Sequence, residues 1–154
     1  MDETARLRSF PLFADLGERE LATLASVTRR QSFNDGERVF SEGEPGRAMY
    51  LVEGGRVRIS KTLPGMGEEA LAILGPGSVF GEMAVLDGSP RSADAIVHEH
   101  AEVLVLDRDA LHGLFAADHE LAYHVLSAMV RTVGGRLRDM NEKLVTVFLL
   151  ARFC

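Results

Sequence analysis

Glycines and other turn residues divide the middle of the chain into short pieces, and this limits the possible folds more than any other feature. Most of the 15 glycines lie between Gly36 and Gly88, many of them in turn signals such as Asn34-Asp35-Gly36 and Pro64-Gly65. Glycine readily adopts the positive φ angles that tight turns need. The apolar runs between these turns are too short for helices and favour strands. Many short strands at near-regular spacing predict an antiparallel roll, sandwich or barrel.

The β-rich section is expected over residues 31–107. Each apolar run is interpreted as a separate strand, and Gly54-Gly55 is interpreted as a turn between two of them. The expected strands are residues 38–40, 49–52, 56–60, 70–74, 78–80, 93–97 and 103–106.

Helical spacing returns on both sides of this section. Residues 1–30 are expected to form an N-terminal helical segment, with a helix that Asp15 can cap. Residues 108–154 are expected to form a short helix near residues 110–115 and a long helix from about residue 119. The predicted fold is therefore α+β: an antiparallel β-roll of the double-stranded β-helix or jelly-roll type with N-terminal helices and a long C-terminal helix. At 154 residues, the chain is expected to be one domain.

The long helix carries an apolar heptad repeat. Leu126, Val133, Met140 and Val147 take one position of the repeat, and Val130, Leu137, Leu144 and Ala151 take the other. Nearly four such heptads predict a coiled-coil seam and therefore a homodimer. The alternative is a helix packed on its own β-domain. The apolar tail over residues 145–150 is expected to pack across the dimer or onto the β-roll.

Charge and cysteine content exclude several classes of protein. There are 17 Lys and Arg against 23 Asp and Glu, a net charge of −6, which gives no general attraction to nucleic acid. The one cysteine, Cys154, excludes an internal disulfide and a multi-cysteine metal site. The longest uncharged apolar stretch, residues 144–151, is too short to cross a membrane, and the N-terminus lacks a signal-peptide pattern. A cytoplasmic protein without membrane contact is expected.

The segment over residues 75–93 carries the most specific chemistry. Gly81 permits a tight turn into a short helix, whose first N–H groups and positive dipole end can hold an anion. Arg91 follows a proline turn, and its planar guanidinium can bind phosphate oxygens in pairs, with the Ser92 hydroxyl beside it. Glu82 would repel an anion, so it needs another partner, such as a sugar hydroxyl. These residues imply a ligand with a phosphate next to a free hydroxyl.

The same segment resembles the phosphate-binding cassette of cyclic-nucleotide-binding domains. The matching residues are Phe80-Gly81-Glu82-Met83-Ala84 and Pro90-Arg91-Ser92-Ala93, and upstream motifs at residues 40–45, 49–57 and 74–77 agree in order. Such domains occur in the catabolite activator/FNR-like superfamily, in kinase regulatory subunits and in gated channels. The resemblance covers roughly residues 10–144 and implies a β-roll flanked by helices.

The resemblance also implies roles for individual residues. Glu82 would bind the ribose 2′-hydroxyl, Arg91 the exocyclic phosphate oxygens, and Asn141 of the long helix a base edge. Backbone amides would come from Gly81, Met83, Ala84 and Ser92, in a cassette that also includes Phe80 and Ala93. Ser92, where a threonine often favours guanine, resembles the cyclic-AMP-type regulators. Cyclic AMP is therefore the expected ligand, with cyclic GMP as the alternative, and no cofactor or metal is expected.

The predicted function is a dimeric, non-enzymatic cyclic-nucleotide sensor that signals through movement of its C-terminal helix. One alternative is a scaffold with a degenerate cassette that binds no ligand. The other is the sensor half of a truncated transcription regulator, because too few residues follow Leu144 for a helix-turn-helix domain, and so no direct DNA binding is expected of this chain. His98 and His100 lack a third ligand and are interpreted as part of a solvated turn, and residues 136–139 as a solvated helix face.

Overall fold

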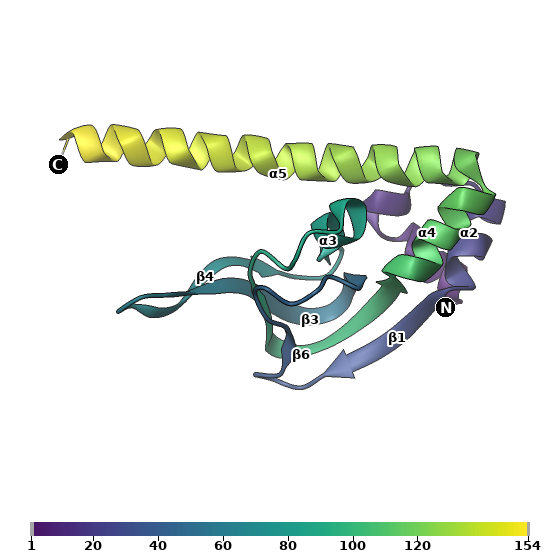
Figure 1. Cartoon of the computed structure of the whole chain (residues 1–154), viewed down its shortest axis with the longest axis horizontal. Helices are drawn as coiled ribbons and strands as arrows, with labels where there is room; N and C mark the ends of the chain where they lie inside the picture. The colour runs from purple at the N-terminus through teal and green to yellow at the C-terminus, as the bar shows by residue number, and fades with distance from the viewer. Residues whose placement is uncertain (1, 154) are drawn as a thin grey trace.

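The computed structural model describes residues 2–153. It confirms the predicted α+β fold: helices precede and follow the strands in the chain, and the long helix α5 runs along one side of the antiparallel sheet (Figure 1). In chain order the elements are α1 (Glu3–Arg8), the 3-10 helix η1 (Pro11–Phe13), α2 (Glu18–Ala25), β1 (Thr28–Phe33), β2 (Arg38–Phe40), β3 (Ala48–Leu63), β4 (Gly67–Leu74), β5 (Val79–Phe80), α3 (Glu82–Asp87), β6 (Asp94–Asp107), α4 (Arg108–Ala117) and α5 (His119–Phe153).

The sheet is built around two long central strands. Its main path runs β1-β6-β3-β4, with β2 paired to β6 and β5 paired to β3, and all of these pairs are antiparallel. The short strands β2 and β5 therefore attach to opposite central strands. They bring the segment before β3 and the segment before α3 to the same part of the roll, and this arrangement positions the site.

The predicted turn at Gly54-Gly55 is wrong. The two predicted strands on either side of it are one strand, β3, and the predicted strands 93–97 and 103–106 are likewise one strand, β6. The pairing register of β3 with β6 shifts on both sides of Gly54. Gly55 has φ +76°, and a Cβ there would lie 1.9 Å from the backbone oxygen of His100. The glycine pair is therefore a bulge at which two backbones approach closely, which short-range sequence patterns do not distinguish from a turn.

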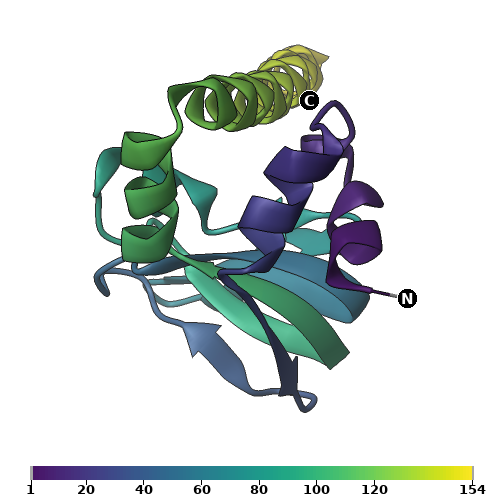
Figure 2. The same cartoon turned by 90° about the vertical axis from the view of Figure 1, so that its right-hand side faces the viewer.

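The two central strands separate two hydrophobic cores because successive side chains of a strand point to opposite faces. Met49 and Leu51 of β3 belong to the core beneath the helices, while Val52 belongs to the core inside the roll. Viewed along α5, the helices α1, α2 and α4 all lie on one side of the sheet, with α5 beyond them (Figure 2). The interior of the roll, on the other side of the central strands, is thus left for aromatic and small aliphatic side chains.

Helices α1, η1 and α2 lie in the predicted N-terminal segment, but the strand β1 begins at Thr28, before the predicted end of that segment, and the cap of α2 is not Asp15. Helix α2 has Gly17 as its N-cap residue, and the Glu20 carboxylate accepts a hydrogen bond from the Gly17 amide at 3.1 Å. This is the reciprocal half of a capping box, so the helix start needs no aspartate. Asp15 instead lies 3.7 Å from Arg131 of α5.

Helix α5 is one continuous helix of 35 residues, as predicted. Its first part is anchored in the core by Leu121, Val125, Ala128 and Met129. Residues 137–153 are all exposed, including the apolar tail, so the prediction that the tail packs onto the β-roll is wrong. Packing across a dimer stays a prediction. Within residues 2–153 no helix is both long and apolar enough to cross a membrane.

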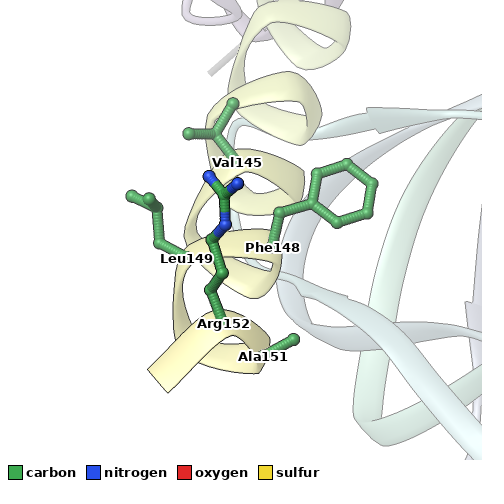
Figure 3. A pocket seen from close by; sticks show the side chains of 5 residues that line it. All are labelled: Val145, Phe148, Leu149, Ala151 and Arg152. Atoms are coloured by element: carbon green, nitrogen blue, oxygen red, sulfur yellow. The ribbon is translucent and has the colours of Figure 1, made fainter. Parts of the chain in front are cut away.

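The end of α5 also carries apolar side chains outside the predicted seam. A shallow hollow on this surface is lined by Val145, Phe148, Leu149, Ala151 and Arg152 (Figure 3). All five residues come from one helix, and Ala151 is the one that belongs to the heptad positions.

Candidate functional site

Glycines shape the turn between β5 and α3. Gly81 is the N-cap residue of α3 with φ +78°, a left-handed conformation that favours glycine. A Cβ on Gly81 would lie 2.7 Å from Nη1 of Arg91, and a Cβ on Gly46 would lie 1.9 Å from the Cβ of Ala84. The backbone of this turn is therefore packed directly against the arginine, and the loop before β3 is packed directly against α3.

Arg91 is a buried cation with an unused hydrogen-bond donor. Its side chain enters the roll after the isolated bridge between Pro45 and Pro90, and the residue is 6% exposed. Nη1 donates to the carbonyl of Gly81 at 2.9 Å and Nη2 donates to the carbonyl of Ala48 at 2.6 Å. Within residues 2–153, Nε is buried without a partner. Buried polar groups are usually hydrogen-bonded, so this donor indicates a place for a ligand acceptor.

Burial also sets the electrostatics of Arg91. It lowers the pKa of the Arg91 guanidinium, and the negative charges of the Glu44 and Glu82 carboxylates oppose this effect. An arginine remains protonated in proteins. The carbonyls, rings and carboxylates around it reduce the free energy cost of burying its charge, and an anionic ligand would reduce this cost further.

Three aromatic rings surround the arginine. Tyr50 and Phe80 are stacked with ring centroids 5.0 Å apart, and Phe40 is tilted against both at about 6 Å. The Cζ atom of Arg91 lies over the Phe40 ring, 4.0 Å from its centroid. Burial raises the pKa of the Tyr50 phenol, so its hydroxyl stays protonated at neutral pH. The wall next to the guanidinium is thus apolar and water-poor.

Glu82, the first residue of α3, is bound to the long helix. It is 4% exposed, and its carboxylate forms an ion pair with Arg136 of α5. Arg136 also donates to the carbonyl of Val79. The prediction that Arg136 belongs to a solvated helix face is therefore wrong. Its guanidinium connects α5 to the turn that carries the candidate site.

Comparison with known proteins identifies this arrangement. The family model of the cyclic nucleotide-binding domain matches residues 30–118. The chain belongs to the cyclic nucleotide-binding domain family. This match includes the turn at Gly81, helix α3 and Arg91, and it confirms the family resemblance found in the sequence.

Individual relatives agree with the family. The domain is 36% identical over 138 residues to the cyclic AMP receptor protein of Thermus thermophilus, covering 90% of this chain and 62% of that protein. It is 36% identical over 109 residues to the cAMP-dependent protein kinase regulatory subunit of Yarrowia lipolytica, covering 70% of this chain and 28% of that protein. The chain thus spans less than two thirds of either relative.

A solved structure has the same fold. The cyclic nucleotide-binding domain from Methylobacillus flagellatus superposes with a TM-score of 0.81 at 29% identity, covering 93% of this chain and 80% of that one. The superposed region is long enough to include the beginning of α5 as well as the roll.

The domain brings together most of the residues predicted for the site. Gly81, Glu82 and Arg91 meet around the turn, while Phe80, Ala84 and Ala93 are buried around them. Met83, by contrast, is 51% exposed, and the side chain of Ser92 is exposed. Asn141 is exposed on α5, beyond Arg136. The roles predicted for these residues toward a nucleotide stay predictions.

Two neighbours of the site, Arg136 and Phe40, were missed. Arg136 is separated from Glu82 by 54 positions, and only the docking of α5 reveals the pair. Phe40 lies in a predicted strand, and an aromatic residue in a strand gives no signal for contact with an arginine.

The two histidines singled out in the sequence lie on strand β6 rather than in a turn. His98 is exposed, while the His100 ring lies 2.9 Å from Glu102. Within residues 2–153 no group of three or more metal-ligating side chains gathers.

Proposed function

We propose that this domain binds a cyclic nucleotide, with cyclic AMP as the preferred ligand. The observation that carries the proposal is Arg91, a buried guanidinium with an unpartnered Nε beside a glycine turn. A phosphate would supply the missing acceptor and the missing negative charge together. The Ser92 hydroxyl would add a donor. Cyclic GMP is the alternative ligand, but the names of the two relatives refer to cyclic AMP.

The ribose would take part through Glu82. Its carboxylate is engaged by Arg136, so a ribose hydroxyl that donates to Glu82 must share this carboxylate or displace the guanidinium. Either outcome changes the contact between α3 and α5. This gives a physical route from ligand binding to the long helix.

The long helix would pass the signal on as part of a homodimer. Its heptad positions in the second half, Leu137, Met140, Leu144 and Val147, are exposed large apolar residues in the single chain. A second copy would cover them, and ligand binding can shift the helix only if the two helix arrangements differ in affinity for the ligand. We infer a regulatory rather than enzymatic role.

A panel of cyclic nucleotides tests the proposal. Calorimetry should give binding of cyclic AMP to the wild-type domain, with weaker binding of cyclic GMP. Arg91→Ala removes charge-assisted hydrogen bonds and should weaken binding by about 1.5–3 kcal/mol. Binding of neither nucleotide to the wild type, together with an unchanged melting temperature in excess ligand, would support the scaffold alternative instead.

A further inference from the structure

The guanidinium of Arg91 lies over the face of the Phe40 ring. Arg91 Cζ lies 4.0 Å from the centroid of Phe40 and 5.9 Å from the centroid of Tyr50. Within the described residues, these are the aromatic rings next to this guanidinium. A guanidinium at such a distance is attracted to the negative face of the ring, and the attraction grows when both are shielded from water. Phe40 and Arg91 are both buried.

The hydrogen bonds and the ring contact of Arg91 restrict different motions of its side chain. The carbonyl oxygens of Gly81 and Ala48 each accept from a terminal nitrogen, which fixes the direction in which the side chain extends. With only two hydrogen bonds to single acceptors, the plane of the guanidinium can still tilt. A flat surface packed against this plane restricts the tilt more strongly. The ring of Phe40 supplies this surface. The donors not used by the carbonyls, including Nε, then keep a fixed direction.

We propose that Phe40 is a positioning residue for phosphate binding: its ring sets the plane of the Arg91 guanidinium so that the unused N–H groups face the phosphate of the nucleotide. The inference rests on the proposed function. It adds a residue from β2, outside the cassette, to the groups that determine affinity. A side chain of similar volume without a ring would fill the core but leave the guanidinium free to tilt.

Phe33 provides a matched control for Phe40. Both phenylalanines are 8% exposed and both belong to the hydrophobic cluster inside the roll. Phe33 lies on β1, where its Cα partner is Ala101 of β6. Replacement of either residue by leucine removes a buried ring from the same core, but only Phe40→Leu removes the ring next to Arg91. Any effect of core loosening alone should therefore appear in both variants.

Calorimetry with cyclic AMP separates the two effects. Phe40→Leu should lower the affinity about three- to tenfold, while Phe33→Leu should change it less than about twofold. Phe40→Tyr keeps the ring and should restore affinity to within about twofold of the wild type. Equal losses in the two leucine variants, with a wild type that binds, would overturn the inference and leave the proposed function intact. A wild type that binds no cyclic nucleotide would overturn both.

A double-mutant cycle shows whether Phe40 acts through Arg91. In an Arg91→Gln background, where binding is weaker but measurable at high protein concentration, Phe40→Leu should cost less than about twofold. The same loss in both backgrounds would mean that Phe40 acts on the nucleotide site independently of Arg91, and would overturn the inference.

A spectroscopic measurement on the unmutated chain covers the case in which Phe40→Leu does not fold. The Nε–H resonance of Arg91, assigned by its disappearance in Arg91→Gln, should be shifted upfield by the ring current of Phe40. Phe40→Tyr should keep this shift. A resonance at the position of an exposed arginine would overturn the inference.

Discussion

The site around Arg91 and the second half of α5 depart from ordinary protein chemistry in opposite ways. At the site, Arg91 and Glu82 are charged groups that are more than nine-tenths buried. On α5, large apolar side chains are exposed to solvent, such as Phe148 at 64% and Leu150 at 62%. Buried charges are rare unless they have partners, and contiguous exposed apolar surfaces mark contact sites. The first region therefore fits the anionic ligand that we propose, and the second fits the proposed second copy of the chain.

The two regions are joined by one ion pair. Arg136 lies at the point of α5 where the buried part of the helix gives way to the exposed part, and it binds Glu82 at the site. Ligand binding at the site can therefore change the free energy of helix assembly. Helix assembly must then change the ligand affinity by the same factor, because coupling between two sites is reciprocal.

The largest effect is expected from a charge placed in the exposed apolar surface. Leu137→Glu would put two carboxylates into the predicted seam, and burying them should raise the dimer dissociation constant at least about a hundredfold. Light scattering coupled to gel filtration should then report a monomer. Arg138→Glu is the control. It changes the net charge by more than Leu137→Glu does, but residue 138 is not one of the apolar heptad positions. A dimer that survives Leu137→Glu would contradict the heptad interpretation.

The second-largest effect is expected from breaking the ion pair between Arg136 and Glu82. Arg136→Ala would leave the Glu82 carboxylate buried without its guanidinium partner. The side chain of Arg136 is 40% exposed, so we expect a loss of about 1–2 kcal/mol in the free energy of unfolding, measured with urea, rather than the larger cost of a fully buried pair.

Adding Glu82→Gln to Arg136→Ala should recover part of this loss, because a neutral amide is less costly to bury than a carboxylate. Arg138→Ala serves as the control on the same helix. No difference between Arg136→Ala and Arg138→Ala would show that the ion pair contributes nothing to stability.

The comparison of regions also explains what the sequence could predict. The β-roll, the long helix and the cassette follow from local patterns: turn residues, a heptad repeat, and a glycine turn followed by an arginine. The seam could be listed residue by residue because helical periodicity is regular. Each of these features is determined by residues that lie close together in the sequence.

The errors have the opposite origin. Gly54-Gly55 looks like a turn because a bulge and a turn both use glycine, and only the close approach of His100 on β6 distinguishes them. The Arg136 and Phe40 contacts join residues far apart in the chain, and neither residue type is unusual in its own element. Long-range contacts of this kind follow from how the elements pack, and a single sequence carries no local signal for them.

A smaller effect is expected from two glycines that look alike in the backbone. Gly77 and Gly81 both have positive φ, so alanine at either position should cost about 1 kcal/mol in stability. A Cβ at Gly77 would meet no atom within 4 Å, whereas at Gly81 it would lie 2.7 Å from Arg91 Nη1. Thermal melting should therefore show a loss for both variants and a larger one for Gly81→Ala, while cyclic AMP titration should show a loss of affinity for Gly81→Ala alone. A similar loss of affinity in Gly77→Ala would mean that backbone strain, and not the arginine, limits binding.

The smallest effect is expected on the outer surface of β6, where charges are exposed in the ordinary way. The pKa of Glu102 is lowered by a hydrogen bond from Ser32 and then by His100, whose Nε2 lies 2.9 Å away. A carboxyl with a depressed folded-state pKa stabilises the fold above its unfolded pKa, and this contribution is lost as pH falls through the folded value.

Glu102→Gln should therefore unfold slightly more easily than the wild type at pH 7, and the difference should disappear as the pH falls through the lowered folded-state pKa of Glu102. Glu69→Gln, which replaces an exposed carboxylate on β4, controls for the removal of a carboxylate. A difference that stays constant with pH would mean that Glu102 acts through packing. A large difference would mean that exposed charges contribute as much to stability as the buried ones at the site, which would break the contrast between these surfaces.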